Sequence, residues 1–354
     1  MKYLLVGMIK IYQLIPGPWH DMCRYTPTCS EYAIIAISKY GTVKGLILSI
    51  KRILRCAPWG GMGYDPVPER KKMKKKILIC ILSVLALTGC KKDSMENITI
   101  YTSTYPIEYI TKELYEDHST VNSIYPNEII NLSDKLIKDY STANLFVYNG
   151  LSNEKEYAVK MLNNNKNLMI VDASMGMEIE KRTEELWLNP SNFLMLCLNI
   201  KNGMKEYITN SYLRKEIDNN YDELYLKVSE LDAELKLLVE NADDKHILVS
   251  NDIFNFLSKY DVKVLSLDTN SVTDKTLENA KAEIAKGDIK YIIMLDNDTL
   301  DDDTEKFITD NKIEKIYYHS LTTLTKEQRD DGKDYISMMK ENLEILKKEL
   351  YDTE

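Results

Sequence analysis

Apolar residues fill almost the whole N-terminal segment of the chain. Before Pro16 the only charges are Lys2 and Lys10, and such a segment suits a helix that lies in a membrane interface. A core helix is the alternative, but a domain of about seventy residues has little core in which to bury one. Two further helical stretches follow, with Ser30 as the expected N-cap of the first and a break at Gly41. The pattern predicts a small helical module.

A different pattern follows residue 90, where short apolar runs alternate with helical stretches. This alternation predicts an α/β fold with mostly parallel sheets. A long strand-free gap separates the third run from the fourth and divides the fold into two lobes, and apolar residues at three- and four-residue steps within it predict an amphipathic helix. The runs are 98–101, 145–148, 169–171, 247–249, 262–265 and 291–294, and the helical stripe is Leu224, Val228, Leu231, Leu235 and Leu238.

Charge divides the chain in nearly the same place. Residues 1–76 hold fourteen Lys or Arg and four Asp or Glu, and the net charge of −9 for the whole chain leaves −19 for residues 77–354. A basic, apolar piece is drawn to anionic lipid or nucleic acid, whereas an acidic remainder avoids both. The six cysteines include no CxxC pair, which argues against a disulfide scaffold.

Residues 73–90 have the composition of a secretory signal. Three lysines follow Met73, and a short apolar run ends in a small residue before Cys90. The run is shorter than the roughly twenty residues that span a bilayer as a helix. Its ending, Leu87-Thr88-Gly89-Cys90, resembles the lipobox of bacterial lipoproteins, which implies cleavage before Cys90 and a diacylglycerol on that cysteine.

A signal that begins at residue 73 has two explanations. Either the chain is a true fusion, or two adjacent reading frames have become one and Met73 was an ancestral start. Topology permits the fusion, in which the basic cluster at 70–76 holds the preceding module in the cytoplasm and residues after Cys90 emerge outside. The expected divisions are a helical module at 1–72, a signal at 73–90 and an exported α/β domain at 91–354.

The basic module carries closely spaced cysteine, arginine, glycine and proline positions. In order and spacing they resemble the YidD family of membrane protein insertion efficiency factors, whose pattern runs CRF-PTCS-YA, then R-x-x-RC-P, GG and DP-x-P. Two departures are small: Tyr25 replaces the usual Phe, and Met62-Gly63-Tyr64 precedes Asp65. The matching residues are Cys23, Arg24, Pro27, Thr28, Cys29, Ser30, Tyr32, Arg52, Cys56, Pro58, Gly60, Gly61, Asp65 and Pro66.

This resemblance implies a peripheral protein on the cytoplasmic side of the plasma membrane that assists insertion of integral membrane proteins. The implied partners are the insertase or translocon, nascent membrane proteins and anionic lipid. Nucleic acid is not expected as a partner. No catalytic constellation is visible in the module. Cys23, Cys29 and Cys56 with His20 are candidate zinc ligands, although their spacing is not that of a usual zinc knuckle. Reduced or paired structural cysteines are the alternative.

The exported domain contains several short motifs: Tyr148-Asn149-Gly150-Leu151, Leu186-Trp187-Leu188-Asn189-Pro190 with Asn192, Leu231-Asp232, and the stretch 334–343. They resemble motifs of the zinc- and manganese-binding lipoproteins of ABC transporters, the ZnuA/AdcA kind. The resemblance implies two α/β lobes joined by a long helix, the cluster A-I architecture, and an ABC permease as partner. It also implies a metal site between the lobes, made of three histidines and a carboxylate, which suit a borderline cation.

The chain departs from that family at the metal ligands. The loop near 126–128, where the first histidine is expected, has none, and His118 and His246 stand at unrelated positions, interpreted as surface residues. The zinc site is therefore expected to be lost. At the remaining ligand positions stand Glu185, Asn251, and Asp296 or, if the later acidic position is the relevant one, His319.

Two functions remain open for the exported domain. In one, Glu185, Asn251 and Asp296 offer oxygen ligands to a harder divalent cation or hold a small polar ligand; in the other, the lobes serve interaction only. The acidic runs at 296–298 and 301–303 lack the glycine and terminal glutamate of an EF-hand loop and are interpreted as solvated turns. No GxSxG, HExxH, P-loop or GxGxxG stands at a strand-to-helix junction, so an enzyme is not expected.

Overall fold

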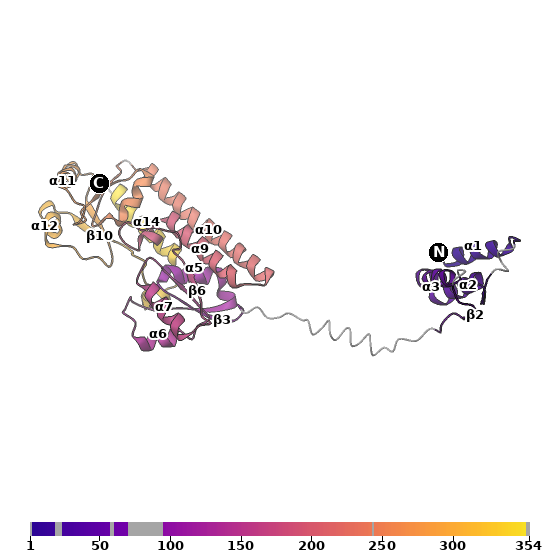
Figure 1. Cartoon of the computed structure of the whole chain (residues 1–354). Helices are drawn as coiled ribbons and strands as arrows, with labels where there is room; N and C mark the ends of the chain where they lie inside the picture. The colour runs from indigo at the N-terminus through magenta and orange to yellow at the C-terminus, as the bar shows by residue number, and fades with distance from the viewer. Residues whose placement is uncertain (1, 18–22, 57–59, 70–94, 243, 352–354) are drawn as a thin grey trace. The chain divides into compact units, whose positions relative to one another are not determined.

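The computed structural model describes residues 2–17, 23–56, 60–69, 95–242 and 244–351. They belong to two compact units, Met1–Lys91 and Lys92–Glu354 (Figure 1). The predicted signal at 73–90, with Cys90, lies outside the described residues, as do His20 and Pro58. In the described part, no helix combines the length and the apolar character that crossing a membrane requires.

Three helices make up most of the N-terminal unit: α1 (Lys2–Leu14), α2 (Cys29–Tyr40) and α3 (Thr42–Arg55). Two short strands, β1 (Tyr25–Thr26) and β2 (Gly63–Tyr64), pair in parallel.

The start of α2 differs from the prediction, because its N-cap is Thr28 and not Ser30. The Thr28 hydroxyl accepts a hydrogen bond from the backbone N–H of Glu31, and the Glu31 carboxylate accepts one from the N–H of Thr28. This reciprocal capping box satisfies two donors that would otherwise lack partners at the helix end. Gly41 ends the helix as expected, with a φ of +84° that favours glycine.

Helices α2 and α3 approach each other closely over a small core. A Cβ atom at Gly45 would lie 2.4 Å from the Cα of Ile37, so a larger residue there would push the helices apart. The buried apolar cluster of the described part of this unit consists of Tyr32, Ala36 and Val67. So small a core contributes little stabilisation.

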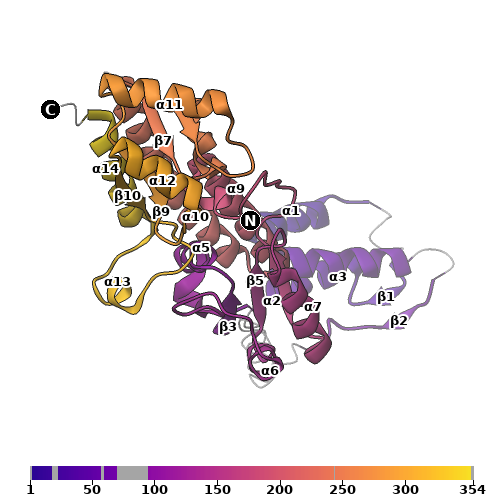
Figure 2. The ribbon, with the colours of Figure 1, turned by 90° about the vertical axis from the view of Figure 1, so that its left-hand side faces the viewer.

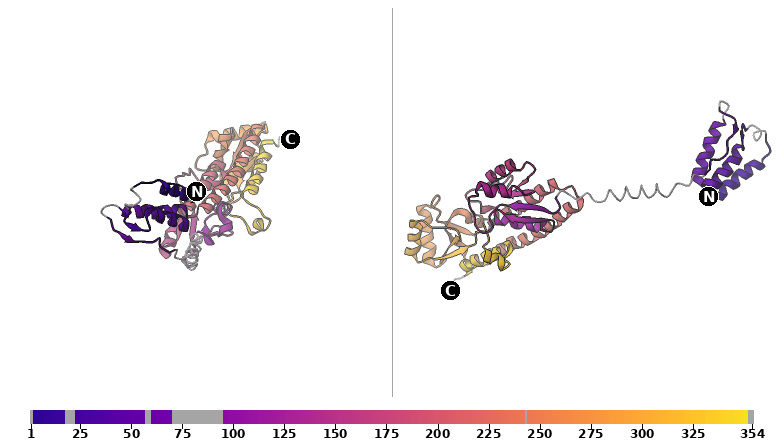
Figure 3. Two further views of the ribbon diagram at one scale, coloured as in Figure 1. Left: turned by 90° about the vertical axis from the view of Figure 1, so that its right-hand side faces the viewer. Right: turned by 90° about the horizontal axis from the view of Figure 1, so that it is seen from below.

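The C-terminal unit contains two four-stranded parallel sheets, each flanked by helices (Figures 2 and 3). The strand order is β4-β3-β5-β6 in the first lobe and β10-β9-β7-β8 in the second. The first lobe comprises β3 (Ile98–Thr102), α5 (Tyr105–Tyr115), β4 (Ser119–Ser123), α6 (Asp134–Tyr140), β5 (Leu145–Tyr148), α7 (Glu154–Asn164) and β6 (Met169–Asp172). The second comprises β7 (His246–Val249), the 3-10 helix η3 (Asp252–Tyr260), β8 (Lys263–Ser266), α11 (Asp274–Lys286), β9 (Tyr291–Leu295), α12 (Asp302–Asn311), β10 (Glu314–Tyr318), α13 (Lys326–Asp330) and α14 (Tyr335–Tyr351).

Between β6 and β7, the regular elements of the described residues are all helices, as the gap in the strand pattern predicted. They are α8 (Glu185–Leu188), α9 (Pro190–Tyr207) and the 30-residue α10 (Ser211–Glu240). α10 packs on α5 of the first lobe and on α14 and η3 of the second, so one helix supports both lobes. Its predicted apolar stripe is buried except at the end, where Val239 is buried and Leu238 only partly so. The predicted architecture of two α/β lobes joined by a long helix is confirmed.

Candidate functional site

Helix α3 of the N-terminal unit presents the opposite polarity from a helix of a soluble domain. Its buried residues are Gly45, Ser49 and Arg52, a small and polar stripe. Its large apolar side chains are exposed instead: Val43, Leu46, Ile47, Ile50, Ile53 and Leu54. Exposure of so many large apolar side chains to water is unfavourable, so this face of α3 is suited to contact with an apolar partner.

Helix α1 adds to this apolar surface, since none of its described residues is buried. Leu4, Met8 and Ile11 recur at helical spacing and are 67%, 59% and 64% exposed. Between the three helices lies a groove of about 800 Å³. Its apolar walls include Ile9 of α1 and Ile50 of α3.

Arg52 is the hub of the N-terminal unit. Its side chain is fully buried, and its Nη1 atom lies 2.6 Å from both the carbonyl oxygen and the Oδ2 of Asp65. Its Nη2 atom donates to the carbonyl of Pro27 at 3.1 Å. The guanidinium carbon lies 4.1 Å from the ring centre of Tyr25 and 4.9 Å from that of Tyr32. Four residues from three parts of the segment, Tyr25 and Pro27, Tyr32, and Asp65, thus meet at one cation.

Other residues of the predicted motif lie around this hub. The Arg24 carbonyl accepts from the N–H of Gly63 at 3.1 Å, which holds the two short strands together. A Cβ at Gly61 would lie 2.7 Å from the hydroxyl of Tyr25, so the tail passes closely over that ring. Gly60 is partly buried, and Pro66 is exposed.

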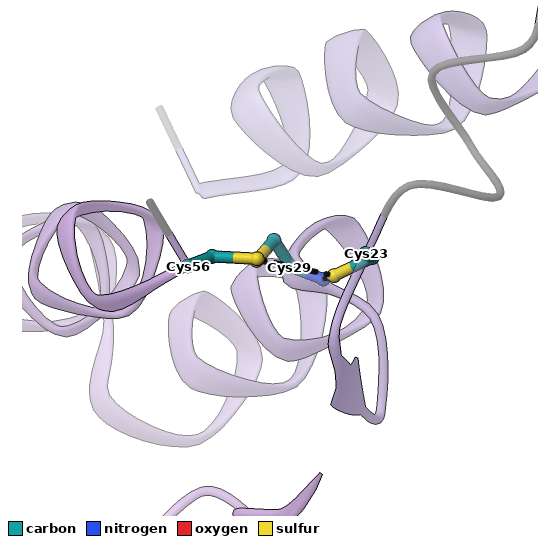
Figure 4. Close-up of side chains that lie close together, drawn as sticks. All are labelled: Cys23, Cys29 and Cys56. Carbon is teal, nitrogen blue, oxygen red and sulfur yellow. Dashed lines mark hydrogen bonds between the residues drawn. The ribbon is translucent and has the colours of Figure 1, made fainter. Parts of the chain in front are cut away.

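Three cysteines of the motif converge (Figure 4). The Sγ of Cys23 lies 3.4 Å from that of Cys29 and 3.9 Å from that of Cys56. The backbone N–H of Cys29 donates to Cys23 Sγ at 3.2 Å. Burial opposes ionisation of Cys23, but hydrogen bonds from the backbone of Tyr25 and Cys29 outweigh it and lower its pKa, whereas burial and the neighbouring sulfurs raise the pKa of Cys29 to about 12.

In the C-terminal unit, Arg182 bridges the two lobes. It lies between β6 and α8, and its Nη1 is 2.5 Å from Asp298 Oδ1, just after β9 of the second lobe. Its Nη2 is 2.5 Å from Glu184 Oε1. Burial alone would lower the pKa of Arg182, but the hydrogen bonds that it donates to Glu184 and Asp298 raise its pKa, so the guanidinium is firmly charged.

Asp298 collects polar groups of the second lobe around the same point. Its Oδ2 accepts from Asn251 Nδ2 at 2.5 Å and from the Ser250 hydroxyl at 3.1 Å. The interpretation of 296–298 as a solvated turn is wrong for this residue, whose side chain is only 8% exposed. A carboxylate survives such burial because Arg182 neutralises it.

The predicted ligand positions have other partners in this structure. Glu185 accepts hydrogen bonds from the backbone N–H groups of residues 180–182 at 2.9–3.2 Å, and so fixes the turn that carries Arg182. Asp296 accepts from the N–H of Ser320 at 3.1 Å and lies 3.5 Å from His319 Nδ1. Burial raises the pKa of Asp296, but hydrogen bonds from His319 and Ser320 lower it overall, and the hydrogen bond to Asp296 raises the pKa of His319.

No shared metal site joins these positions within the described residues, where Cys23, Cys29 and Cys56 form the one group of three or more His, Cys, Asp or Glu side chains with close ligand atoms. His118 pairs with Glu216 at 2.9 Å and His246 with Asp244 at 2.7 Å. Both rings are partly buried, at 25% and 19% exposure, and not fully on the surface as interpreted from the sequence. Residues 126–128 of the first-histidine loop are exposed.

Further contacts hold the lobes together. Arg329 donates to both carboxylate oxygens of Glu108 at 3.0 and 2.9 Å, and the indole N–H of Trp187 donates to the carbonyl of Ser320 at 2.8 Å. Lys181 pairs with Asp252 at 3.1 Å. The sequence patterns did not single out Arg182 or Arg329, and they assigned Asp298 to a solvated turn. The one available signal for Arg182 was its place three residues before Glu185, the second ligand position.

Two family models match the chain. The model described as "Putative membrane protein insertion efficiency factor" matches residues 1–68, and that of ZnuA, "Zinc-uptake complex component A periplasmic", matches residues 100–349. A curated insertion efficiency factor of Chromobacterium violaceum is 55% identical over 69 residues, which are 19% of this chain and 100% of that protein. One of Parabacteroides distasonis is 78% identical over 46 residues, 13% of this chain and 63% of that protein.

Solved structures resemble the C-terminal unit. The metal-dependent lipoprotein YcdH of Bacillus subtilis matches with a TM-score of 0.59 and 21% identity, over 72% of this chain and 99% of that one. The Zn(II)-bound ZnuA-like domain of Streptococcus pneumoniae AdcA matches with a TM-score of 0.56 and 21% identity, over 72% and 99%. At such identity the likeness establishes the fold.

Proposed function

Because the chain belongs to the family of membrane protein insertion efficiency factors over residues 1–68 and to the ZnuA family over residues 100–349, we propose that it joins two working parts. The N-terminal unit assists insertion of integral membrane proteins at the cytoplasmic face of the plasma membrane. The C-terminal unit is an exported, lipid-anchored lobe pair whose cleft is held by an ion-pair network in place of zinc. Both families are of binding proteins and insertion factors, not of known enzymes.

The reversed polarity of α3 supports the first part most strongly. Exposed apolar side chains on α1 and α3 gain free energy when they enter the membrane interface, by about 25 cal/mol per Å² of apolar surface removed from water. Lys44, Lys51 and Arg55 on α3 add attraction to anionic headgroups, about 1 kcal/mol per basic residue near the surface. The unit would lie beside the insertase or translocon and meet the apolar segments of nascent membrane proteins there.

Replacing Leu4, Met8 and Ile11 of α1 together with aspartate is expected to abolish binding to anionic vesicles. The side chains are exposed, so their replacement leaves the core of the unit intact while it removes apolar area and adds negative charge. A loss of about 1 kcal/mol for each of the three side chains, about 3 kcal/mol in all, raises the dissociation constant for vesicles by a factor of more than a hundred. Vesicle flotation measures the binding, and protease protection of a pulse-labelled membrane protein, in cells that lack their own factor, measures insertion.

A matched control is available on the C-terminal unit. Tyr212, Leu226 and Leu237 of α10 are similarly exposed, at 70%, 63% and 57%, and their replacement with aspartate makes the same charge change. This variant is expected to bind vesicles and to support insertion as the unaltered chain does. Normal insertion by the α1 variant in the absence of vesicle binding would refute the membrane role of α1.

The second part of the proposal rests on the chemistry of the cleft. Zinc favours neutral imidazole and free carboxylates as ligands. Here the Glu185 carboxylate accepts hydrogen bonds from three backbone N–H groups. Asn251 donates a hydrogen bond to Asp298, which is also paired with Arg182. These residues do not fit a zinc site. The lobes then serve as a partner-binding surface, for which an ABC permease is the family's candidate.

Binding of a harder divalent cation through the oxygens of Glu185, Asn251 and Asp296 is the second candidate for this unit. The carboxylates present at these positions favour it. It predicts that Mn²⁺ or Ca²⁺ raises the melting temperature of the unaltered chain. The ion-pair network predicts no such rise, because the guanidinium of Arg182 already supplies the positive charge.

Residues 73–90 would separate the two parts as a lipoprotein signal, with Cys90 as the lipidated residue. The basic residues at 70–76 support a cytoplasmic position for what precedes them. Signal peptidase cleavage, or a separate start at Met73, would release the lobe pair as an independent lipoprotein outside the membrane.

A further inference from the structure

The three cysteines of the N-terminal unit come from three separate segments. Cys23 precedes β1, Cys29 is the first residue of α2, and Cys56 follows α3. Their sulfurs nevertheless lie within 4.8 Å of one another (Figure 4). We propose that Cys23, Cys29 and Cys56 hold one zinc ion as thiolates and so brace the insertion unit.

The sulfur positions match the geometry of such a site. Zinc–sulfur bonds are about 2.3 Å, so two corners of a tetrahedron around zinc are about 3.8 Å apart. The measured Sγ distances from Cys23 are 3.4 Å to Cys29 and 3.9 Å to Cys56. Small movements of the side chains would bring all three to bonding distance of one ion, whose fourth position water or another donor can take.

The surrounding backbone supports bound thiolates. The N–H of Cys29 donates to Cys23 Sγ at 3.2 Å, and hydrogen bonds of this kind orient metal ligands. Cys29 lies at the N-terminal end of α2, where the helix dipole favours negative charge. The capping box of Thr28 and Glu31 fixes that end.

The unit also needs a brace. Among its described residues, the buried apolar cluster consists of Tyr32, Ala36 and Val67, and many large apolar side chains of α1 and α3 are exposed. Domains of this size commonly add a disulfide or a metal to a weak core. The proposed function puts the unit in the reducing cytoplasm, where a bound metal persists and a disulfide does not. Three thiols can all bind one ion, whereas one disulfide would leave the third cysteine unpaired.

Cobalt titration of the reduced full-length chain tests the site. One equivalent of Co²⁺ is expected to give thiolate-to-cobalt charge-transfer absorption that Zn²⁺ then displaces, and Cys29→Ser is expected to lose it. Cys197→Ala, which changes the cysteine of the C-terminal core, keeps it. Oxygen ligands in the C-terminal unit do not give this absorption, and the readout is independent of insertion activity, so failure of the site and failure of the proposed function can be told apart.

A second measurement needs no variant. With Zn²⁺ at a hundred times the dissociation constant, about one molecule in a hundred is metal-free, so alkylation of Cys23, Cys29 and Cys56 is expected to slow about a hundredfold, read by mass spectrometry. Absence of the charge-transfer absorption, or equal alkylation with and without Zn²⁺, would overturn the proposal. So would a Cys23–Cys29 disulfide in chain purified from the cytoplasm without oxidation.

Discussion

Arg182→Ala is expected to lower the free energy of unfolding of the C-terminal unit by about 2–4 kcal/mol, because it leaves the buried carboxylates of Glu184 and Asp298 without their cation. The loss is below that of a fully buried pair, since the Arg182 side chain is 34% exposed. Urea unfolding followed through the fluorescence of buried Trp187 measures it. The lobes are also expected to separate more readily, which small-angle scattering would detect.

Two further variants identify the cause. Asp298→Asn in the Arg182→Ala background removes one uncompensated charge and is expected to recover part of the lost stability. Arg182→Lys keeps the positive charge, but an ammonium lacks the planar guanidinium that donates to Glu184 and Asp298 at the same time. Arg182→Ala is also expected to make the chain respond to Mn²⁺, which can replace the missing cation. Unchanged stability on removal of the guanidinium would eliminate it as the link between the lobes.

Arg52→Ala is expected to unfold the N-terminal unit. Asp65 is 33% exposed and keeps Arg55 as a partner, so loss of the ion pair costs less than the roughly 3–5 kcal/mol of a fully buried pair, but this unit has only a small core to oppose the loss. The change also leaves two carbonyls, of Pro27 and Asp65, without donors. Hydrogen exchange of peptides from 29–55, measured by mass spectrometry on the full-length chain, reports the unit separately from the lobes.

Arg55→Ala is the matched control for this change. Arg55 also pairs with Asp65, at 3.1 Å, but its side chain is 58% exposed, so its loss is expected to cost less than about 1 kcal/mol. Arg52→Lys should fall between the two, because lysine has no planar fork for two carbonyls and two rings. Equal protection from exchange in Arg52→Ala and Arg55→Ala would mean that burial of Arg52 does not hold the fold.

Much of the fold could be predicted because its strands are short apolar runs. Five of the six predicted runs lie wholly on strands, and the run 262–265 begins one residue before β8; in the two lobes, β4 and β10 were missed. Both are edge strands, and their sequences, Ser-Thr-Val-Asn-Ser and Glu-Lys-Ile-Tyr-Tyr, carry polar residues. An edge strand is exposed along one side, so its sequence need not be continuously apolar.

The candidate sites were less accessible to sequence reasoning. Histidine positions could be checked against a family pattern, and their absence predicted a lost zinc site. The ion pair of Arg182 with Asp298 could not be predicted, because the two residues are 116 positions apart in sequence and meet only in the folded C-terminal unit. Asp298 resembled a residue of a solvated turn, since burial of a carboxylate depends on a partner that the local sequence does not contain.

The most direct test of a bipartite chain is the mass of a C-terminally tagged product from a bacterial host that processes lipoproteins. We expect the tag on a fragment that begins at a diacylated Cys90, with Cys90→Ala as the control that prevents the modification. A single product at the full 41.0 kDa with unmodified Cys90 would contradict the separation of an insertion factor from an exported lobe pair.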